Sequence, residues 1–347
     1  KLYVSKITMQ TDEFIKRMET GILIDVRSPK EFKQGHIPGA INMPLLEDDE
    51  RSEIGTLYTK QSAETAILRG LELVGSKLAS FYKKIQALQF HKEKKAIGVY
   101  CWRGGMRSNN MAALIRMWGY DVFVLEGGYK AYRKSMEDLL THHSWNFRLL
   151  GGFTGCGKTD VLRQLVSLNE QVIDLEALAN HKGSAFGHLG MSEQPSSEMF
   201  ENNIHAILRT MNPQKPVWIE AESCRIGHVQ IPDLFFNRMK QAPLYFYEIP
   251  YEKRIDRLCR EYGSYAKPDL IDAFCKIMRR LGGDRTQDAI RAIESDQLKD
   301  AVSIALAYYD RSYEKSLSDQ GNPAVYKISM HDDDPKGGAH RLVSFQN

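Results

Sequence analysis

The sequence lacks any apolar run long enough to cross a membrane, and its first twenty residues lack the basic-then-apolar grading of a signal peptide. Cysteine is scarce: the 347 residues include five, without a Cys-x-x-Cys pair. This pattern argues against a disulfide framework and against a zinc site. We therefore expect a cytoplasmic protein. The formal net charge of +3 is small, so it permits a nucleic-acid partner without requiring one.

The length of the chain indicates two domains, because 347 residues exceed one ordinary hydrophobic core. Short apolar runs alternate with helical patterns in both halves, which predicts an α/β fold with two parallel-sheet domains. We place the first domain at residues 1–140, with a helical insertion at about 45–91, and the second at residues 141–347. The first strand is expected at residues 2–7.

The insertion begins with an acidic stretch and then changes character. We interpret Tyr58, Lys60 and Gln61 as part of a polar turn exposed to water. Beyond it, apolar residues recur at three- and four-residue spacing from Ile67 to Ile85, which predicts a helix with one apolar face.

A cysteine lies between a buried strand predicted at 96–100 and a predicted helix. The turn reads Cys101-Trp102-Arg103-Gly104-Gly105-Met106-Arg107-Ser108. Its two glycines let backbone N–H groups face inward, and the start of the helix adds partial positive charge, so the loop can cradle an anion. The same field, together with Arg103 and Arg107, favours a thiolate. We predict that Cys101 is a nucleophile; a buried structural cysteine is the alternative.

A second candidate site follows a short strand predicted at 147–150. The next residues match G-x-x-x-x-G-K-[ST] and lead into an apolar helix face: Gly152-Phe153-Thr154-Gly155-Cys156-Gly157-Lys158-Thr159. This strand, loop and helix context is the one that a P-loop requires. We predict that Gly152, Gly155, Gly157 and Lys158 bind a diphosphate, and that Thr159 helps to hold Mg²⁺.

Acidic residues end two further predicted strands of the second domain. Glu220 and Glu222 follow an apolar strand at i, i+2 spacing, which places both carboxylates on one side if the strand persists, so either is a candidate partner of the metal. Asp174 ends the other strand. A polar glycine loop with His181 and Ser184 follows it, and we expect this loop to close over a ligand. The sequence has no Asn-Lys-x-Asp segment, which argues against a GTPase.

Basic residues recur at helical spacing after the strand predicted at 244–247, which we take as the last one. They are Lys253, Arg257, Arg260, Lys276, Arg279, Arg280, Arg285 and Arg291. Such a stripe can follow a phosphate backbone. Acidic residues are interleaved with it, however, so a solvated, salt-bridged helix is the alternative to an RNA-binding face.

The first domain resembles a rhodanese, a sulfurtransferase whose loop cysteine carries a chalcogen atom as a persulfide. The resemblance rests on Ile24-Asp25-Val26-Arg27, Glu31-Phe32, Gly35-His36-Ile37-Pro38-Gly39-Ala40 and the Cys101 loop. Rhodanese loops usually hold four residues between the cysteine and the arginine, whereas five separate Cys101 from Arg107. The wider loop resembles that of related phosphatases and suits a tetrahedral anion, so phosphatase chemistry stays an alternative.

A rhodanese-like domain followed by a P-loop NTPase-like domain resembles the bacterial tRNA 2-selenouridine synthases over nearly the whole chain. The resemblance implies that selenium from selenophosphate replaces the sulfur of a wobble 2-thiouridine, by way of S-geranyl-2-thiouridine made from geranyl diphosphate. It implies that Cys101 is the catalytic cysteine and that the Lys158 loop binds geranyl diphosphate.

The partners that the resemblance implies are tRNA, through its anticodon loop, and an enzyme that supplies selenophosphate. Trp102, Tyr129 and Tyr132 are candidates for stacking on a splayed base, with packing in the core as the alternative. Two other functions compete: a sulfurtransferase or phosphatase joined to a small-molecule kinase, and a non-enzymatic switch that senses an oxyanion and a nucleotide.

Overall fold

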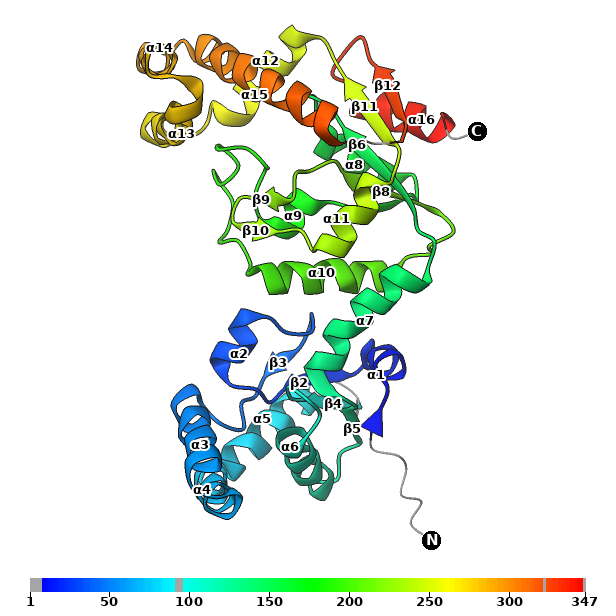
Figure 1. Cartoon of the computed structure of the whole chain (residues 1–347), viewed down its shortest axis with the longest axis vertical. Coiled ribbons are helices and arrows are strands. Elements are labelled where there is room, and N and C mark those ends of the chain that lie inside the picture. Colours follow the sequence, from blue (N-terminus) through cyan, green and yellow to red (C-terminus); the bar gives the residue numbers. More distant parts are fainter. Residues whose placement is uncertain (1–7, 91–95, 321–322, 346–347) are drawn as a thin grey trace. The chain divides into compact units, whose positions relative to one another are not determined.

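The computed structural model describes residues 8–90, 96–320 and 323–345 (Figure 1). The chain divides into two compact units, Lys1–Leu139 and Leu140–Asn347. The strand expected at residues 2–7 lies outside the described residues. Among the described residues, no helix combines the length and the apolar character needed to cross a membrane.

The first unit is built on a five-stranded sheet of order β1-β5-β4-β2-β3, in which every described pairing is parallel. The strands are β1 (Thr8–Met9), β2 (Ile22–Asp25), β3 (Ile41–Asn42), β4 (Ile97–Tyr100) and β5 (Val122–Leu125). All residues of β2, β4 and β5 are buried, as expected for parallel strands covered on both faces.

Helices cover both faces of this sheet. On one face, α5 (Leu78–Phe90) and α6 (Met106–Met117) contribute Ile85 and Met111 to the core. On the other, α1 (Thr11–Met18) and α7 (Gly128–His142) contribute Phe14 and Tyr129. The short helix α2 (Pro29–Gln34) begins with a capping box between Ser28 and Glu31.

The insertion forms three helices, because α3 (Asp48–Lys60) and α4 (Ala63–Gly75) precede α5. The predicted polar turn is wrong for Tyr58 and Lys60, which lie in α3, although Tyr58 is exposed as expected. Helix α3 buries no residue, so apolar periodicity gives no sign of it. Its acidic first turn and the capping box formed by Glu47 and Glu50 favour a helix start instead.

The second unit is built on a five-stranded sheet of order β12-β11-β6-β8-β7, again with parallel pairings throughout. The strands are β6 (Asn146–Gly151), β7 (Gln171–Ile173), β8 (Pro216–Glu220), β11 (Leu244–Glu248) and β12 (Val325–Ser329). The prediction that the last strand lies at 244–247 is wrong, since β12 follows it. Only Ile328 of β12 is buried, so this edge strand has a weak sequence pattern.

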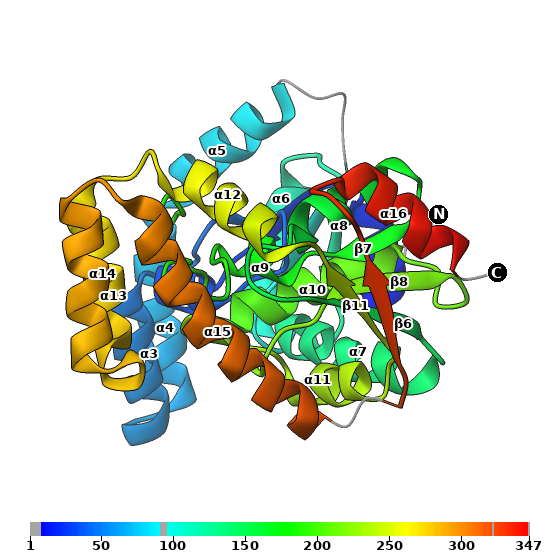
Figure 2. The same cartoon turned by 90° about the horizontal axis from the view of Figure 1, so that it is seen from above.

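Helices α8 (Lys158–Ser167) and α16 (Pro335–Ser344) cover one face of the second sheet, where Val161 and Leu342 share a core with Trp218. The remaining short elements are α9 (Leu175–Ala179), α10 (Ser197–Thr210), β9 (Arg225–Ile226), β10 (Val229–Gln230) and α11 (Asp233–Lys240). Four helices pack together into a layer of their own, as Figure 2 shows: α12 (Tyr251–Tyr262), α13 (Lys267–Leu281), α14 (Gly283–Glu294) and α15 (Leu298–Gln320).

Candidate functional site

Cys101 lies directly after β4, at the carboxyl edge of the first sheet, and its side chain is buried. Its sulfur lies 3.2 Å from the hydroxyl oxygen of Ser108, in the first turn of α6. That hydroxyl is also within 3.1 Å of the carbonyl of Gly105, to which it can donate. Ser108 can therefore turn its proton toward Cys101 when the sulfur is a thiolate.

The shape of the Cys101 loop is fixed by the start of α7. The backbone N–H of Tyr129 donates to the carbonyl of Cys101 (2.9 Å), and that of Lys130 donates to the carbonyl of Trp102 (3.0 Å). Gly104 has a positive φ of 66°, and a Cβ there would lie 2.6 Å from the carbonyl oxygen of Leu125. Glycine is therefore needed for the loop to approach this strand end.

The two arginines of the loop have different surroundings. Arg107 pairs with Glu31 of α2, with Nη1 and Oε2 2.7 Å apart. Burial favours a higher pKa for the Glu31 carboxyl, but its hydrogen bond with Arg107 and the charge of that arginine outweigh burial and lower the pKa. Arg103 is exposed and makes no ion pair among the residues that the structure describes. The loop therefore leaves one guanidinium open to solvent.

The aromatic residues near the loop also differ. Tyr129 and Tyr132 are buried in the core, so the packing alternative holds for both. The ring of Tyr129 lies 3.9 Å from the guanidinium carbon of the buried Arg27. Trp102 is 39% exposed, which leaves its ring as the one surface among these three that a base can reach.

The P-loop connects the central strand β6 to α8 in the second unit. Gly157 has a positive φ of 87° at the N-cap of α8. Gly152 has a φ of 152°, and a Cβ there would lie 2.2 Å from the carbonyl oxygen of Tyr247. These two positions exclude a side chain for reasons of backbone geometry and space. The loop therefore keeps the compact form in which its N–H groups can bind phosphate.

Two helices of the separate helical layer hold this loop. The N–H of Gly152 donates to the hydroxyl of Tyr313 in α15 (3.1 Å). Arg254 of α12 donates to the carbonyl of Thr154 (3.2 Å) and forms a bidentate pair with Asp310 of α15, at 2.8 and 2.7 Å. These residues have no local sequence signal that links them to the P-loop.

Lys158 curls back over its own loop, and its ammonium donates to the carbonyl of Gly152 (3.1 Å). Burial alone lowers the pKa of this amine, but the neighbouring Cys156, Tyr313, Glu220 and Glu176 outweigh burial and raise it. The ammonium is therefore positively charged throughout the physiological range.

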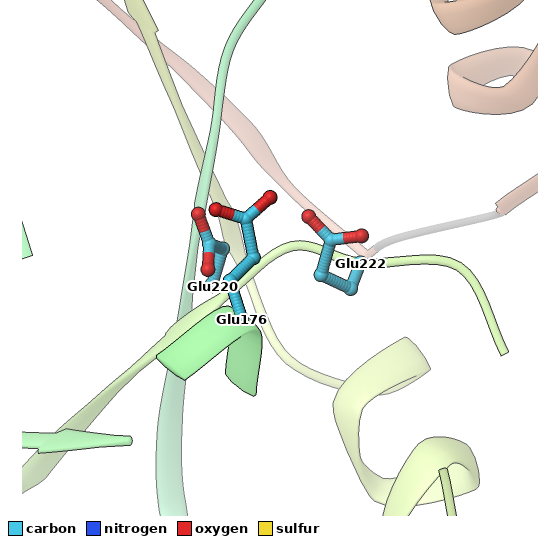
Figure 3. Close-up of side chains that lie close together, drawn as sticks. All are labelled: Glu176, Glu220 and Glu222. Atoms are coloured by element: carbon cyan, nitrogen blue, oxygen red, sulfur yellow. The ribbon is translucent and has the colours of Figure 1, made fainter. Parts of the chain in front are cut away.

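Three carboxylates gather close together, as Figure 3 shows: Glu176 comes from α9, Glu220 from the end of β8 and Glu222 from the loop after it. Oε2 of Glu176 lies 3.5 Å from Oγ1 of Thr159 in the P-loop. One oxygen of each lies within 4.8 Å of the others. Glu220 ends the strand next to β6, where it is paired in register with Leu150. Both of its oxygens are buried, and neither has a hydrogen-bond partner in the described part of the chain.

Burial and mutual repulsion disfavour the ionisation of all three acids in the absence of a cation. Burial, followed by the charge of neighbouring acids, raises the pKa values of Glu176 and Glu222 to about 8 and that of Glu220 well above its ordinary value. Oxygen ligands of this kind suit a small divalent cation. The unpartnered oxygens of Glu220 and the close approach of the three side chains fit such an ion.

The polar loop predicted to close over a ligand lies against these acids. Gly183 has a φ of 69°, and a Cβ there would lie 2.7 Å from an oxygen of Glu176. Ser184 accepts a hydrogen bond from the N–H of Phe186 (3.2 Å).

His181 is buried, and its Nδ1 has no partner among the described residues. Burial is the main cause that lowers its pKa, and the charges of two nearby histidines lower it further. Asp174 caps α9, accepting from the N–H of Ala177 (2.9 Å).

The ten residues of the second domain that are predicted to bind a diphosphate, a metal or a ligand line one cleft of about 1880 Å³. They are Gly152, Gly155, Gly157, Lys158, Thr159, Asp174, His181, Ser184, Glu220 and Glu222. Sequence reasoning did not select Glu176, although it follows the acidic strand end at Asp174 by two residues. The five-residue helix α9 is too short to show a periodic pattern that would orient it.

Six of the basic residues lie on two helices with different surroundings, and Arg291 of α14 pairs with Asp288. In α12, Lys253 pairs with Asp332 (2.8 Å), and Arg257 and Arg260 both pair with Asp333 (2.7 and 2.8 Å). This confirms the salt-bridged alternative for that helix. In α13, Lys276, Arg279 and Arg280 line the cleft. Neither arginine of this second group makes an ion pair within the described ranges, so α13 presents open positive charge.

Comparison with known proteins agrees with both units. The chain matches the model of the rhodanese-like domain over residues 10–135 and that of the "tRNA 2-selenouridine synthase AAA domain" over residues 145–332. A tRNA 2-selenouridine synthase of Shewanella denitrificans is 34% identical over 350 residues, which cover 89% of this chain and 92% of that protein. The chain belongs to the tRNA 2-selenouridine synthase family.

Two other tRNA 2-selenouridine synthases are similar, one over most of the chain and one over about two thirds of it. That of Marinobacter nauticus is 33% identical over 343 residues, covering 89% of this chain and 92% of that protein. That of Nitrosomonas europaea is 40% identical over 247 residues, covering 69% of this chain and 63% of that protein. Membership of the tRNA 2-selenouridine synthase family confirms the predicted order of a rhodanese-like domain followed by a P-loop domain.

Proposed function

We propose that the protein is an enzyme that replaces the sulfur of a wobble 2-thiouridine in tRNA with selenium. The observation that carries this proposal is the presence of two candidate anion sites in one chain of this family. One is a buried cysteine at the edge of an anion-binding loop, and the other is a P-loop beside three carboxylates. Either site alone fits a simpler reaction, whereas a two-step exchange at a tRNA base needs both.

The P-loop unit carries out the first step, which activates the sulfur as a leaving group. The diphosphate of geranyl diphosphate binds to the N–H groups of residues 152–157 and to the ammonium of Lys158. The sulfur of 2-thiouridine attacks the first carbon of the geranyl group. A carbon–sulfur bond forms, a carbon–oxygen bond breaks, and diphosphate leaves.

Thr159 and the three glutamates are the residues that would hold Mg²⁺ in this unit. Thr159 Oγ1 lies 3.5 Å from Glu176 Oε2, so the hydroxyl and the carboxylates converge. A bound Mg²⁺ neutralises charge that develops on a diphosphate leaving group. Lys158 helps to neutralise the same charge, because its ammonium is held at the P-loop by the carbonyl of Gly152.

The Cys101 loop carries out the second step, in which selenium arrives as selenophosphate. Its N–H groups and Arg103 bind the tetrahedral anion, and selenium attacks C2 of the S-geranylated base. Geranyl thiol leaves, and water then cleaves the phosphorus–selenium bond to give selenouridine and phosphate. A covalent selenium–sulfur bond on Cys101 would need a two-electron acceptor, which release of phosphate does not supply. We therefore propose that Cys101 does not carry selenium covalently but lies beside the bound selenophosphate.

The substrate of both steps is the anticodon loop of a tRNA. The open charges of Arg279 and Arg280 on α13 suit its phosphates, and the exposed ring of Trp102 offers a stacking surface for a splayed base. A base inside a stacked loop hides its C2 atom, so splaying is required before either step.

Mass spectrometry of tRNA nucleosides tests this proposal. Thiolated tRNA is incubated with the protein, selenophosphate, geranyl diphosphate and Mg²⁺, and each reagent is omitted in turn. We expect selenouridine only in the complete mixture, and S-geranyl-2-thiouridine when selenophosphate is omitted. No modified nucleoside, together with phosphate release from ATP in the absence of tRNA, would support the fused kinase instead.

A further inference from the structure

A second, smaller cavity adjoins the P-loop cleft inside the helical layer of the second unit. Its volume is about 40 Å³. Five residues line both spaces and so form the boundary between them: Thr154, Ser184, Leu258, Tyr262 and Tyr309. Thr154 belongs to the P-loop itself, and a Cβ on Gly155 would lie 2.8 Å from the side chain of Leu258. The cavity therefore begins where the phosphate-binding loop ends.

One face of α15 forms a long wall of this cavity. The residues that line it are spaced as successive turns of one helix: Leu298, Ala301, Val302, Ala305, Leu306 and Tyr309. The two alanines lie in the middle of this face, and Phe274 of α13 and Phe186 also line the cavity. Small side chains on one wall thus leave space next to large rings.

Two polar groups at the boundary already have partners within the protein. The hydroxyl of Tyr309 accepts from the N–H of Ala185 (3.1 Å), and that of Ser184 accepts from the N–H of Phe186 (3.2 Å). Beyond the boundary the lining is hydrocarbon and aromatic. A ribose or a purine would lose hydrogen bonds with water there without replacing them, whereas an alkenyl chain would gain from burial.

We propose that this cavity receives the distal end of the isoprenoid chain of a prenyl diphosphate whose diphosphate binds to the P-loop. This inference rests on the proposed function, and it adds the residues that select the chain. The small side chains of Ala301 and Ala305 leave room there for the terminal methyl groups of the chain. An apolar cavity of roughly 150 Å³ holds a benzene molecule, so a space of about 40 Å³ takes the tip of the chain but not a further isoprene unit. The cavity thus limits the length of the transferred group.

The test is a competition between dimethylallyl, geranyl and farnesyl diphosphates at equal concentration, with the S-alkylated nucleosides of tRNA measured by mass spectrometry. Ala305→Leu fills the cavity, so we expect the ratio of geranyl to dimethylallyl product to fall about tenfold. Ala307→Leu is the matched control, because Ala307 lies exposed on the same helix and does not line the cavity. This control should keep the wild-type ratio.

A widening variant gives an independent test. Phe274→Leu enlarges the cavity, so the ratio of farnesyl to geranyl product should rise several-fold. Phe235→Leu, in the core around α11, is its control. Binding of inorganic diphosphate, which needs only the P-loop, should be unchanged in all variants. If Ala305→Leu no longer binds inorganic diphosphate, the ratio of farnesyl to geranyl product in Phe274→Leu decides whether the cavity limits the chain length.

The outcomes separate the inference from the proposed function. Transfer by the wild type with product ratios unchanged in both cavity variants would overturn the inference and leave the proposed function standing. Absence of any alkylated nucleoside with the wild type and all three diphosphates would overturn both.

Discussion

Thr159 Oγ1 and Glu176 Oε2 lie 3.5 Å apart, which brings the last residue of the P-loop pattern to a carboxylate from a different strand–helix unit. Glu176 stands in the first turn of α9, and the cap formed by Asp174 holds that turn in place. The contact joins Thr159, the predicted metal residue, to an acid that is not among the predicted site residues.

We expect Glu176→Gln to weaken Mg²⁺-dependent binding of geranyl diphosphate about tenfold. The amide keeps the shape of the side chain but removes one negative charge from the cluster, and a hard cation prefers charged oxygen ligands. Titration of Mg²⁺ at fixed geranyl diphosphate measures the effect. Glu193→Gln is the control, because Glu193 is exposed and lies outside the cluster. Equal Mg²⁺ dependence in both variants would contradict the assignment.

We expect Glu176 and Glu222 to make the free energy of unfolding of the metal-free protein depend on pH. Burial and neighbouring acids raise both pKa values from the ordinary 4.5 to about 8. Between these values the unfolded chain has released protons that the folded protein still holds, so the free energy of unfolding falls as the pH rises. This contribution is complete below about pH 4.5 and is lost as the pH passes about 8.

Urea unfolding in a chelator, at about pH 5.5 and about pH 8, measures this dependence. Glu222→Gln has one titrating carboxyl fewer, so its free energy of unfolding should fall less between the two conditions than that of the wild type. Glu193→Gln should behave as the wild type does. A Glu222→Gln protein with the wild-type pH dependence would show that Glu222 is not protonated in the folded state.

The pair of Arg254 and Asp310 couples the P-loop to the helical layer. Arg254 is buried, so Arg254→Ala leaves the partly buried Asp310 without its partner and removes the donor to Thr154. We expect a loss of about 3 kcal/mol in the free energy of unfolding. Diphosphate affinity should fall as well, since the loop loses an anchor. Lys299→Ala breaks the exposed pair with Asp256 and should change stability little.

Much of the architecture is predictable because buried parallel strands have continuous apolar runs. The runs at Ile22–Asp25 and Ile97–Tyr100 are buried along their whole length, and a glycine loop follows the second of them. Elements without an apolar face escape this reasoning. Helix α3 buries no residue, and the edge strand β12 buries one. Their formation depends on end capping and on pairing with β11, which sequence periodicity does not report.

The candidate site divides in a similar way. The P-loop residues share one short segment whose spacing alone identifies them. Glu176, Arg254 and Tyr313 reach the P-loop from distant segments, and only the fold brings them together. Tyr129 is the opposite case. Its place in the sequence suggested stacking on a base, but the fold buries its side chain in the core.

The central claim is that the two units carry out separate steps, and complementary variants test it most directly. With all reagents present, Cys101→Ser should accumulate S-geranyl-2-thiouridine in tRNA without forming selenouridine. Lys158→Ala should form neither product from thiolated tRNA, yet should convert tRNA that already carries the S-geranyl group into selenouridine tRNA. If Lys158→Ala geranylates normally, or if Cys101→Ser still forms selenouridine, the assignment of the steps to the two units is wrong.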